Sequence, residues 1–277
     1  MAIPTSNRTN DEHATKKPYV RLATAEDFPQ LVTMGARAFV RDPVLLYVGN
    51  VQQLQGEVLQ PKEERVLQAF ISVSLRSTAS RGGRIIVVAV PSSVSSVYEI
   101  DGSEKIASCT CWLPPNKRVK KHQFLKLAND GAVPLLTAWG VRGTTRMGDQ
   151  YLDKVHHILA KSFKSRGFEK KDVDTKAWYL LLAMTDPDFQ GRGYLPMLMR
   201  DQFAHAPGQN YILETTTEKA KNQYTHFGFE VQETFYVGKG KVGMDGLPAS
   251  EEAATGAKAY PMVKVGVEWY YSGSEVR

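Results

Sequence analysis

The sequence predicts a mixed α/β fold in which a sheet is flanked by helices. Strand-like apolar runs and helix-like apolar spacings follow one another in the order strand, helix, strands, helix, strand, helix, strands. The chain of 277 residues is 42% hydrophobic and 23% charged, which is enough for a sizeable core and excludes wholesale disorder. Residues 1–17 are polar and aperiodic, so we expect a disordered tail there and a single folded domain over residues 18–277.

The first part of the chain predicts one strand and two helices. A capping-box-like pattern from Thr24 to Asp27 precedes apolar residues at helical spacing, which indicates the start of a helix. We expect this helix to end at Asp42-Pro43, because the residue before a proline disfavours helical backbone angles. The expected ranges are 19–22 for the strand, and 28–39 and about 61–76 for the helices.

The rest of the chain predicts further strands, two helices and a long irregular segment. From residue 84 the apolar pattern becomes strand-like. Residues 114–176 have mixed polarity and contain helical stretches, of which residues 149–163 are the clearest. The aromatic residues 269–271 are expected to pack back onto the fold. The expected strands are 85–90, 97–100, 105–113, 178–184, 211–215, 229–237 and 259–265, and the expected helices are 194–203 and 218–227.

Charge and composition exclude several classes of protein. The formal net charge is +6, but the basic residues are spread along the chain and are not interleaved with aromatic residues, so we expect no nucleic-acid partner. No apolar run approaches the roughly 18 residues of a membrane helix, and the start shows no secretory signal. Cys109 and Cys111 are two apart on an expected strand and therefore share one face instead of forming a bridge. We expect a soluble, cytoplasmic protein.

A glycine turn after the most apolar strand is the most informative segment. Gln190-Gly191-Arg192-Gly193 joins that strand to a helix, so backbone N–H groups and the helix dipole favour an anion there. Arg192 adds a donor suited to phosphate. The Walker pattern is excluded because no lysine follows the second glycine. A dinucleotide loop stays open, since Glu214 lies about 20 residues on, and so does a purely structural turn.

Four segments in the same order resemble the GNAT superfamily of acyl-CoA-dependent N-acetyltransferases. That family carries Q/R-x-x-G-x-G/A after its fourth strand, and residues 190–194 match it up to the last position. Residues 213–215 resemble its L-E-T strand, residues 224–229 its Y-x-x-x-G-F helix end, and residues 21–43 its opening strand and helix. The resemblance covers roughly half of the chain.

The resemblance implies a mostly antiparallel sheet and acetyl-CoA as co-substrate. Compact members join the third and fourth strands by a short turn, so residues 114–176 would be a helical insertion beside the acceptor cleft. Two positions depart from the family: Leu195 stands where it prefers Gly or Ala, and Ala220 where it often has asparagine. Both changes imply weakened but not abolished binding. The implied cofactor-binding residues are Met184 and Thr185 along the pantetheine arm, and Gln190, Gly191, Arg192, Gly193, Tyr194 and Leu195 at the pyrophosphate.

The implied chemistry is direct attack of an amine on the thioester. The family's usual acid corresponds to Tyr224, which would protonate the departing CoA thiolate. A base should take the proton of the amine, and Glu214 is our candidate, with Glu99 and Asp101 as alternatives. We expect no metal, because the adjacent His156 and His157 point about 100° apart on a helix.

We therefore expect transfer of an acetyl group from acetyl-CoA to a primary amine of a small molecule. A protein or peptide N-acetyltransferase is an alternative acceptor class. A non-catalytic acyl-CoA-binding protein is an alternative of a different kind, motivated by Leu195 and Ala220. A nucleotide-dependent oxidoreductase is the third and requires NAD(P) binding. We expect no membrane partner, and the sequence does not indicate an oligomeric state.

Overall fold

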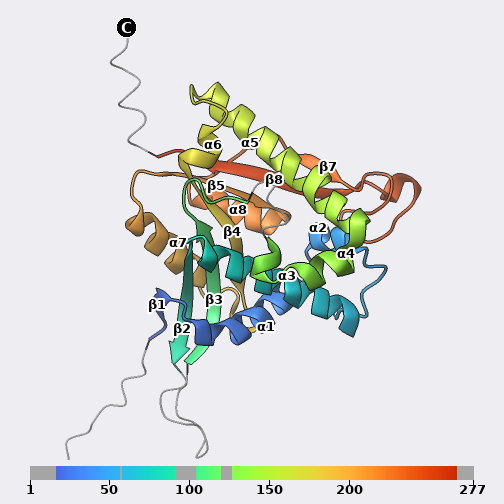
Figure 1. The fold of residues 1–277 in the computed structure, drawn as a ribbon, viewed down its shortest axis with the longest axis horizontal. Helices are drawn as coiled ribbons and strands as arrows, with labels where there is room; N and C mark the ends of the chain where they lie inside the picture. Colours follow the sequence, from blue (N-terminus) through green and yellow to red (C-terminus); the bar gives the residue numbers. More distant parts are fainter. Residues whose placement is uncertain (1–16, 57, 92–103, 120–126, 267–277) are drawn as a thin grey trace, which may run out of the picture.

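The computed structural model describes residues 17–56, 58–91, 104–119 and 127–266. Three expectations fall outside these ranges: the tail, apart from residue 17, the strand at 97–100 and the packing of residues 269–271. Figure 1 shows a twisted sheet with helices on both sides. The strands are β1 (Tyr19–Leu22), β2 (Arg84–Pro91), β3 (Glu104–Leu113), β4 (Ala177–Thr185), β5 (Asn210–Thr215), β6 (Glu230–Val231), β7 (Phe235–Val237) and β8 (Ala257–Lys264).

The strands pair in the order β1-β2-β3-β4-β5-β8-β6, with β7 also on β8. Each pairing is antiparallel except that of β4 with β5. The predicted mixed and mostly antiparallel sheet is therefore confirmed. The helices are α1 (Phe28–Phe39), α2 (Pro43–Gly49), α3 (Pro61–Ser80), α4 (Val133–Thr145), α5 (Asp153–Ser165), α6 (Asp172–Thr175), α7 (Tyr194–His205) and α8 (Glu218–His226).

Helices cover the two faces of the sheet in separate apolar clusters. On one face, α1 and α3 pack on β2, β3 and β4 through Leu31, Ile71 and Leu75. On the other face, α7 packs through Leu198 and Met199 on residues of β2, β3 and β5. Cys109 and Cys111 both lie in the first cluster, fully buried and unbridged, as their spacing predicted.

The segment between β3 and β4 adds helices to the far half of the sheet. A π-helical turn, Arg146–Leu152, joins α4 to α5. The buried face of α5, including Val155, Leu159 and Phe163, packs against Ile212 of β5 and neighbouring strands. Helices α2 and α4 pack against each other beside α3 (Figure 1). None of the helices in the described ranges has the length and apolar character needed to cross a membrane.

The first helix ends before Asp42-Pro43, as the sequence predicts, but a second helix that the sequence interpretation missed begins there. Asp42 is the N-cap of α2, its Oδ1 accepts the amide of Leu45 at 2.8 Å, and Pro43 occupies the first helical turn. Aspartate followed by proline is itself a helix-start signal, which the sequence interpretation did not use. One sequence prediction is wrong in detail. The strand expected at 229–237 is broken into β6 and β7, and the intervening Gln232 amide donates to the carbonyl of Pro261 at 2.9 Å.

The decisive feature for the site is the separation of β4 from β5. The two strands pair only over Ala177–Tyr179 and Asn210–Ile212, although β4 continues to Thr185 and β5 to Thr215. The register of β4 against β3 shifts by one residue between Leu180 and Leu182, which is a β-bulge at Leu181. Beyond these pairs the backbone groups on the facing edges of β4 and β5 are not bonded to each other, and a cleft opens between the strands.

Candidate active site

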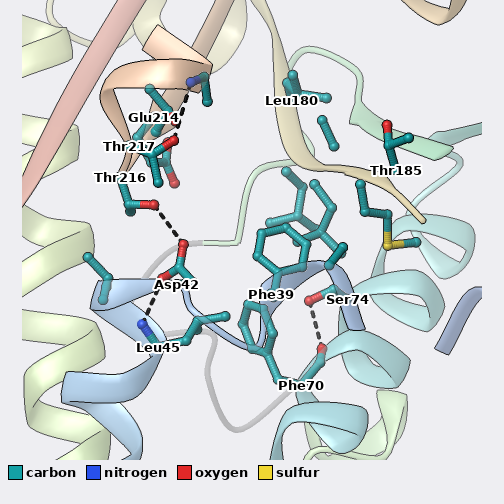
Figure 2. Close-up of a pocket in the computed structure, with 18 of the residues that line it drawn as sticks. Phe39, Asp42, Leu45, Phe70, Ser74, Leu180, Thr185, Glu214, Thr216 and Thr217 are labelled. Carbon is teal, nitrogen blue, oxygen red and sulfur yellow. Dashed lines mark hydrogen bonds between the residues drawn. The ribbon is translucent and has the colours of Figure 1, made fainter. Parts of the chain in front are cut away.

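A cavity of about 720 Å³ opens where β4 and β5 separate. Its lining comes from the end of α1, α2, α3, α4, the far half of β4, the loop before α7, the end of β5 and the start of α8. Figure 2 shows Glu214 and Thr216 beside Asp42, with the rings of Phe39 and Phe70 lower in the same pocket. Most of the lining side chains are apolar, and the polar groups gather at the end of β5 and around Asp42, as in ligand-binding clefts generally.

The glycine turn lies between β4 and α7, at one end of this cavity. Gly191 and Gly193 have positive φ angles of 77° and 78°, which other L-residues rarely adopt, and Gly193 is the N-cap of α7. No other residue lies within 4 Å of the position where a Cβ would stand on either glycine. An anionic group therefore has open access to the N-terminus of the twelve-residue helix α7, which fits the pyrophosphate of CoA.

An arginine from α1 ties down the start of this turn. Nη1 of Arg37 donates to both oxygens of Asp186 at 3.0 and 2.9 Å, and Nη2 donates to Asp188 at 3.0 Å. Asp186 is 4% exposed, and it also accepts the amide of Asp188. The start of the turn is thus anchored to α1.

All of the predicted cofactor residues line the cavity, and two of them, Arg192 and Gln190, make polar contacts with neighbouring residues. Arg192 is exposed, donates to the carbonyl of Asp188 at 3.2 Å and lies over the ring of Phe189. Gln190 is exposed and accepts a hydrogen bond from Lys219 at 3.3 Å. The residues that were predicted to bind the cofactor and that line the cavity are Met184, Thr185, Gln190, Gly191, Arg192, Gly193, Tyr194 and Leu195.

The two positions that depart from the family pattern also lie on the cavity wall. Leu195 and Ala220 are half-buried and pack against the apolar cluster under α7. The amide of Ala220 is bonded to the hydroxyl of Thr217, which caps α8. Neither side chain covers the open space beside Gly191 and Gly193.

Glu214 lies on β5 just beyond the last residue paired with β4. Its Oε1 accepts the hydroxyl of Tyr179 at 2.5 Å, whereas its Oε2 is buried without a hydrogen-bond partner in the described ranges. Burial raises the pKa of this carboxyl, and the Arg118 charge and the Tyr179 hydrogen bond oppose that rise. A buried carboxylate with one free oxygen beside a cavity is suited to take a proton.

Tyr224 lies on α8, is 7% exposed and lines the same cavity. Its hydroxyl forms no hydrogen bond with another described residue. Burial raises its pKa, and the charge of Glu214 raises it further. Tyr224 therefore stays protonated at neutral pH and is a hydrogen-bond donor, although a weaker acid than a free phenol.

Four polar residues of the cavity were missed by the sequence interpretation. Asp42 accepts the hydroxyl of Thr216 at 2.6 Å, and burial raises its pKa. Tyr179 donates a hydrogen bond to Glu214. Burial raises the pKa of Tyr151, and the nearby charges of Glu214 and Asp42 raise it further. The fourth, Arg118, follows β3. Only the Asp-Pro helix start was a readable signal, because the others become neighbours through the tertiary fold.

Two of the proposed bases fall outside the described residues. These are Glu99 and Asp101. Of the three candidate bases, Glu214 is the one that belongs to the described residues, and it lines the cavity. In the part of the chain that is described, no group of three or more His, Cys, Asp and Glu side chains is arranged to hold a metal ion. His156, one of the two histidines set aside, pairs with Asp174 at 3.2 Å.

Comparison with solved structures identifies the fold. A histone acetyltransferase HPA2-related acetyltransferase from Corynebacterium glutamicum ATCC 13032 matches with a TM-score of 0.53 and 18% identity, over 91% of this chain and 98% of that chain. The chain has the GNAT fold. A mosquito arylalkylamine N-acetyltransferase-like 5b matches with a TM-score of 0.50, 13% identity and 90% and 100% coverage of the two chains. Arylalkylamine N-acetyltransferase 2 from Aedes aegypti matches with a TM-score of 0.50, 12% identity and 90% and 99% coverage.

The sequence alone shows no such relative: no protein-family model and no curated protein matches the chain. The structural likeness at 18% identity or less therefore establishes the fold. Within the GNAT fold, the segment that resembles the family's glycine motif stands between β4 and α7, where the resemblance predicts it. The predicted acid on α8 and the predicted base on β5 face one cavity in this fold.

Proposed function

We propose that this protein transfers an acetyl group from acetyl-CoA to a primary amine of a small molecule. The observation that carries the proposal is a single cavity between separated strands, with an anion-binding turn at one end and Glu214 and Tyr224 in its wall. A strand edge with unpaired groups suits the amide-bearing pantetheine arm, which would add to β4 at Met184 and Thr185. The diphosphate would lie on the amides of residues 191–195.

The reaction would form a C–N bond and break the C–S bond of the thioester. The nitrogen of the neutral amine attacks the carbonyl carbon, and one amine proton passes to Glu214, directly or through water. The electron pair of the C–S bond leaves with sulfur. Tyr224 gives its proton to the departing sulfur and regains one from solvent, while the proton held by Glu214 is released to solvent, so that the net products are the N-acetyl amine and CoA thiol.

The low exposure of both side chains supports this assignment. Glu214 is half-buried, with Oε2 out of contact with water, and burial favours its neutral form, so accepting a proton relieves part of the cost of the buried charge. Tyr224 has no competing partner among the described residues and is available to the departing sulfur. Positioning both groups around one bound thioester supplies the orientation on which direct transfer depends.

The proposal is tested by ligand binding followed by turnover. The melting temperature should rise with acetyl-CoA and with CoA but not with NADH or NADPH, since a ligand at 100 times its Kd adds about 2.7 kcal/mol of stability. An amine panel with thiol detection should then show acetyl-CoA consumption that depends on the amine. Binding of CoA without turnover of any amine would instead establish the non-catalytic acyl-CoA-binding alternative. Stabilisation by NADH or NADPH alone would favour the oxidoreductase.

A further inference from the structure

Arg118 is a cavity-lining cation that the proposed transfer chemistry does not use. Its guanidinium carbon lies 4.5 Å from the centre of the Tyr179 ring, and Nη1 is buried without a hydrogen-bond partner in the described part of the chain. No described carboxylate lies within ion-pair distance of it. Leaving a charged donor unsatisfied is costly, and a guanidinium is the side chain best shaped to take a carboxylate through two parallel hydrogen bonds.

The opposite charge stands beside the same tyrosine. Glu214 holds the hydroxyl of Tyr179 with Oε1, while its Oε2 has no partner within the described residues. Arg118 and Glu214 therefore contact the face and the hydroxyl of one ring, close enough for the guanidinium to act on the carboxyl. A molecule with an amine and an anionic group on neighbouring atoms complements this pair, because each of its ends meets the opposite charge.

The apolar wall of the cavity indicates a third feature of the acceptor, a side chain, in addition to its amine and its anionic group. Phe39, Leu45 and Phe70 face the cavity from the α1–α3 side (Figure 2), and Trp139 of α4 lies 6.0 Å from the ring of Phe70. Leu135 and Leu136 of α4 extend this apolar wall. An apolar side chain of the acceptor would be removed from water there, at about 25 cal/mol per Å² of buried area.

We propose that the acceptor is an α-amino acid with a large apolar side chain, whose carboxylate binds Arg118, whose amine faces Glu214 and whose side chain lies against Phe70 and Trp139. The proposal rests on the acetyl transfer proposed above, and the product is the N-acetyl amino acid. A polyamine would bring a second cation towards Arg118, and a simple aryl- or alkylamine would leave the guanidinium without a partner. A peptide N-terminus lacks a carboxylate next to its amine.

The test compares substrates that differ only in the carboxylate. L-Phenylalanine is paired with 2-phenylethylamine, and L-leucine with 3-methylbutylamine, each at saturating acetyl-CoA. We expect kcat/KM at least 10-fold higher for each amino acid than for its amine, and little activity with L-alanine, which lacks the large side chain. The Arg118→Gln variant is compared at the alkaline plateau of the kcat/KM profile, because there Glu214 is ionised with or without the Arg118 charge. Under that condition Arg118→Gln should lower kcat/KM for the amino acids 30-fold or more and change it for the matched amines by less than 3-fold. Arg200→Gln, on the exposed side of α7, is the control and should change neither.

The outcomes separate this proposal from the proposed function. If the amines are acetylated as well as or better than the amino acids, or if Arg118→Gln lowers both members of a pair equally, the amino-acid assignment is wrong and acetyl transfer stands. Because the matched amine is measured in the same variant, misfolding appears as loss of both. If acetyl-CoA gives no thermal shift and no amine is acetylated, both proposals fall.

Discussion

The hydroxyl of Tyr179 donates a hydrogen bond of 2.5 Å to Oε1 of Glu214 at the point where β4 and β5 separate. Tyr179 is the last residue of β4 paired with β5, and Glu214 lies two residues beyond Ile212, its partner across the strands. The bond therefore spans the two strands where their backbone pairing stops. It fixes one oxygen of the carboxylate, while the other is buried without a hydrogen-bond partner in the described residues.

Removing this hydrogen bond should shift the pH dependence of turnover. The bond lowers the pKa of Glu214 against the effect of burial, so Tyr179→Phe should raise that pKa. Glu214 must be ionised to accept a proton, so the acidic limb of the kcat/KM profile should move to higher pH. Activity at the alkaline plateau should fall less than 10-fold. An unchanged acidic limb would show that another group limits the rate.

Replacing Glu214 by glutamine should stabilise the protein and abolish turnover. The folded-state pKa of Glu214 is raised above its unfolded value, so the native protein is destabilised progressively as pH rises through the interval between the two. The melting temperature of Glu214→Gln should therefore exceed that of the native protein at pH 8. The difference should disappear below about pH 4, where the carboxyl is protonated in both states. Each unit of pKa shift corresponds to about 1.4 kcal/mol. A lower melting temperature for the variant at pH 8 would contradict the raised pKa.

Tyr224→Phe should separate binding from chemistry. The substitution removes one hydroxyl from a buried ring, so the fold and the Kd for CoA, measured by calorimetry, should change by less than 3-fold. Loss of the donor to the thiolate should lower kcat about 10²-fold to 10⁴-fold. Because burial and Glu214 raise the pKa of Tyr224, the alkaline limb of the native profile should show no titration of this phenol below pH 10. Retention of full kcat would remove Tyr224 from the mechanism.

Arg37→Gln should loosen the glycine turn without touching the cavity chemistry. The variant leaves the buried carboxylate of Asp186 with only the amide of Asp188, and an unpaired buried charge costs about 1–3 kcal/mol. We expect a lower melting temperature and at least 5-fold weaker CoA binding, with kcat at saturating acetyl-CoA nearly unchanged. Arg65→Gln, on the exposed side of α3, serves as a charge-matched comparison. Equal losses of CoA affinity in both variants would attribute the effect to net charge.

The sequence by itself predicted most of the strands and helices, the glycine turn at residues 190–195 between β4 and α7, and the positions of Glu214 on a strand and Tyr224 on a helix near that turn. These depend on local periodicity, on glycines that accept positive φ and on motif spacing, all of which are readable within about ten residues. The same local rules predicted the end of α1 before Asp42-Pro43 but missed the start of α2 there, because a proline after aspartate fits both the end of one helix and the first turn of the next.

Only the tertiary structure decided what Glu214 faces. Strand periodicity places it on β5 but does not show that pairing with β4 has stopped two residues earlier, nor that Tyr179 takes one of its oxygens. Arg118 and Asp42 come from segments about 100 and 170 residues away along the chain, and each reaches the cavity through the packing of the helices on the sheet. Proximity between such distant residues depends on the packing of the whole chain, and so do the burial and charge interactions that set their pKa values.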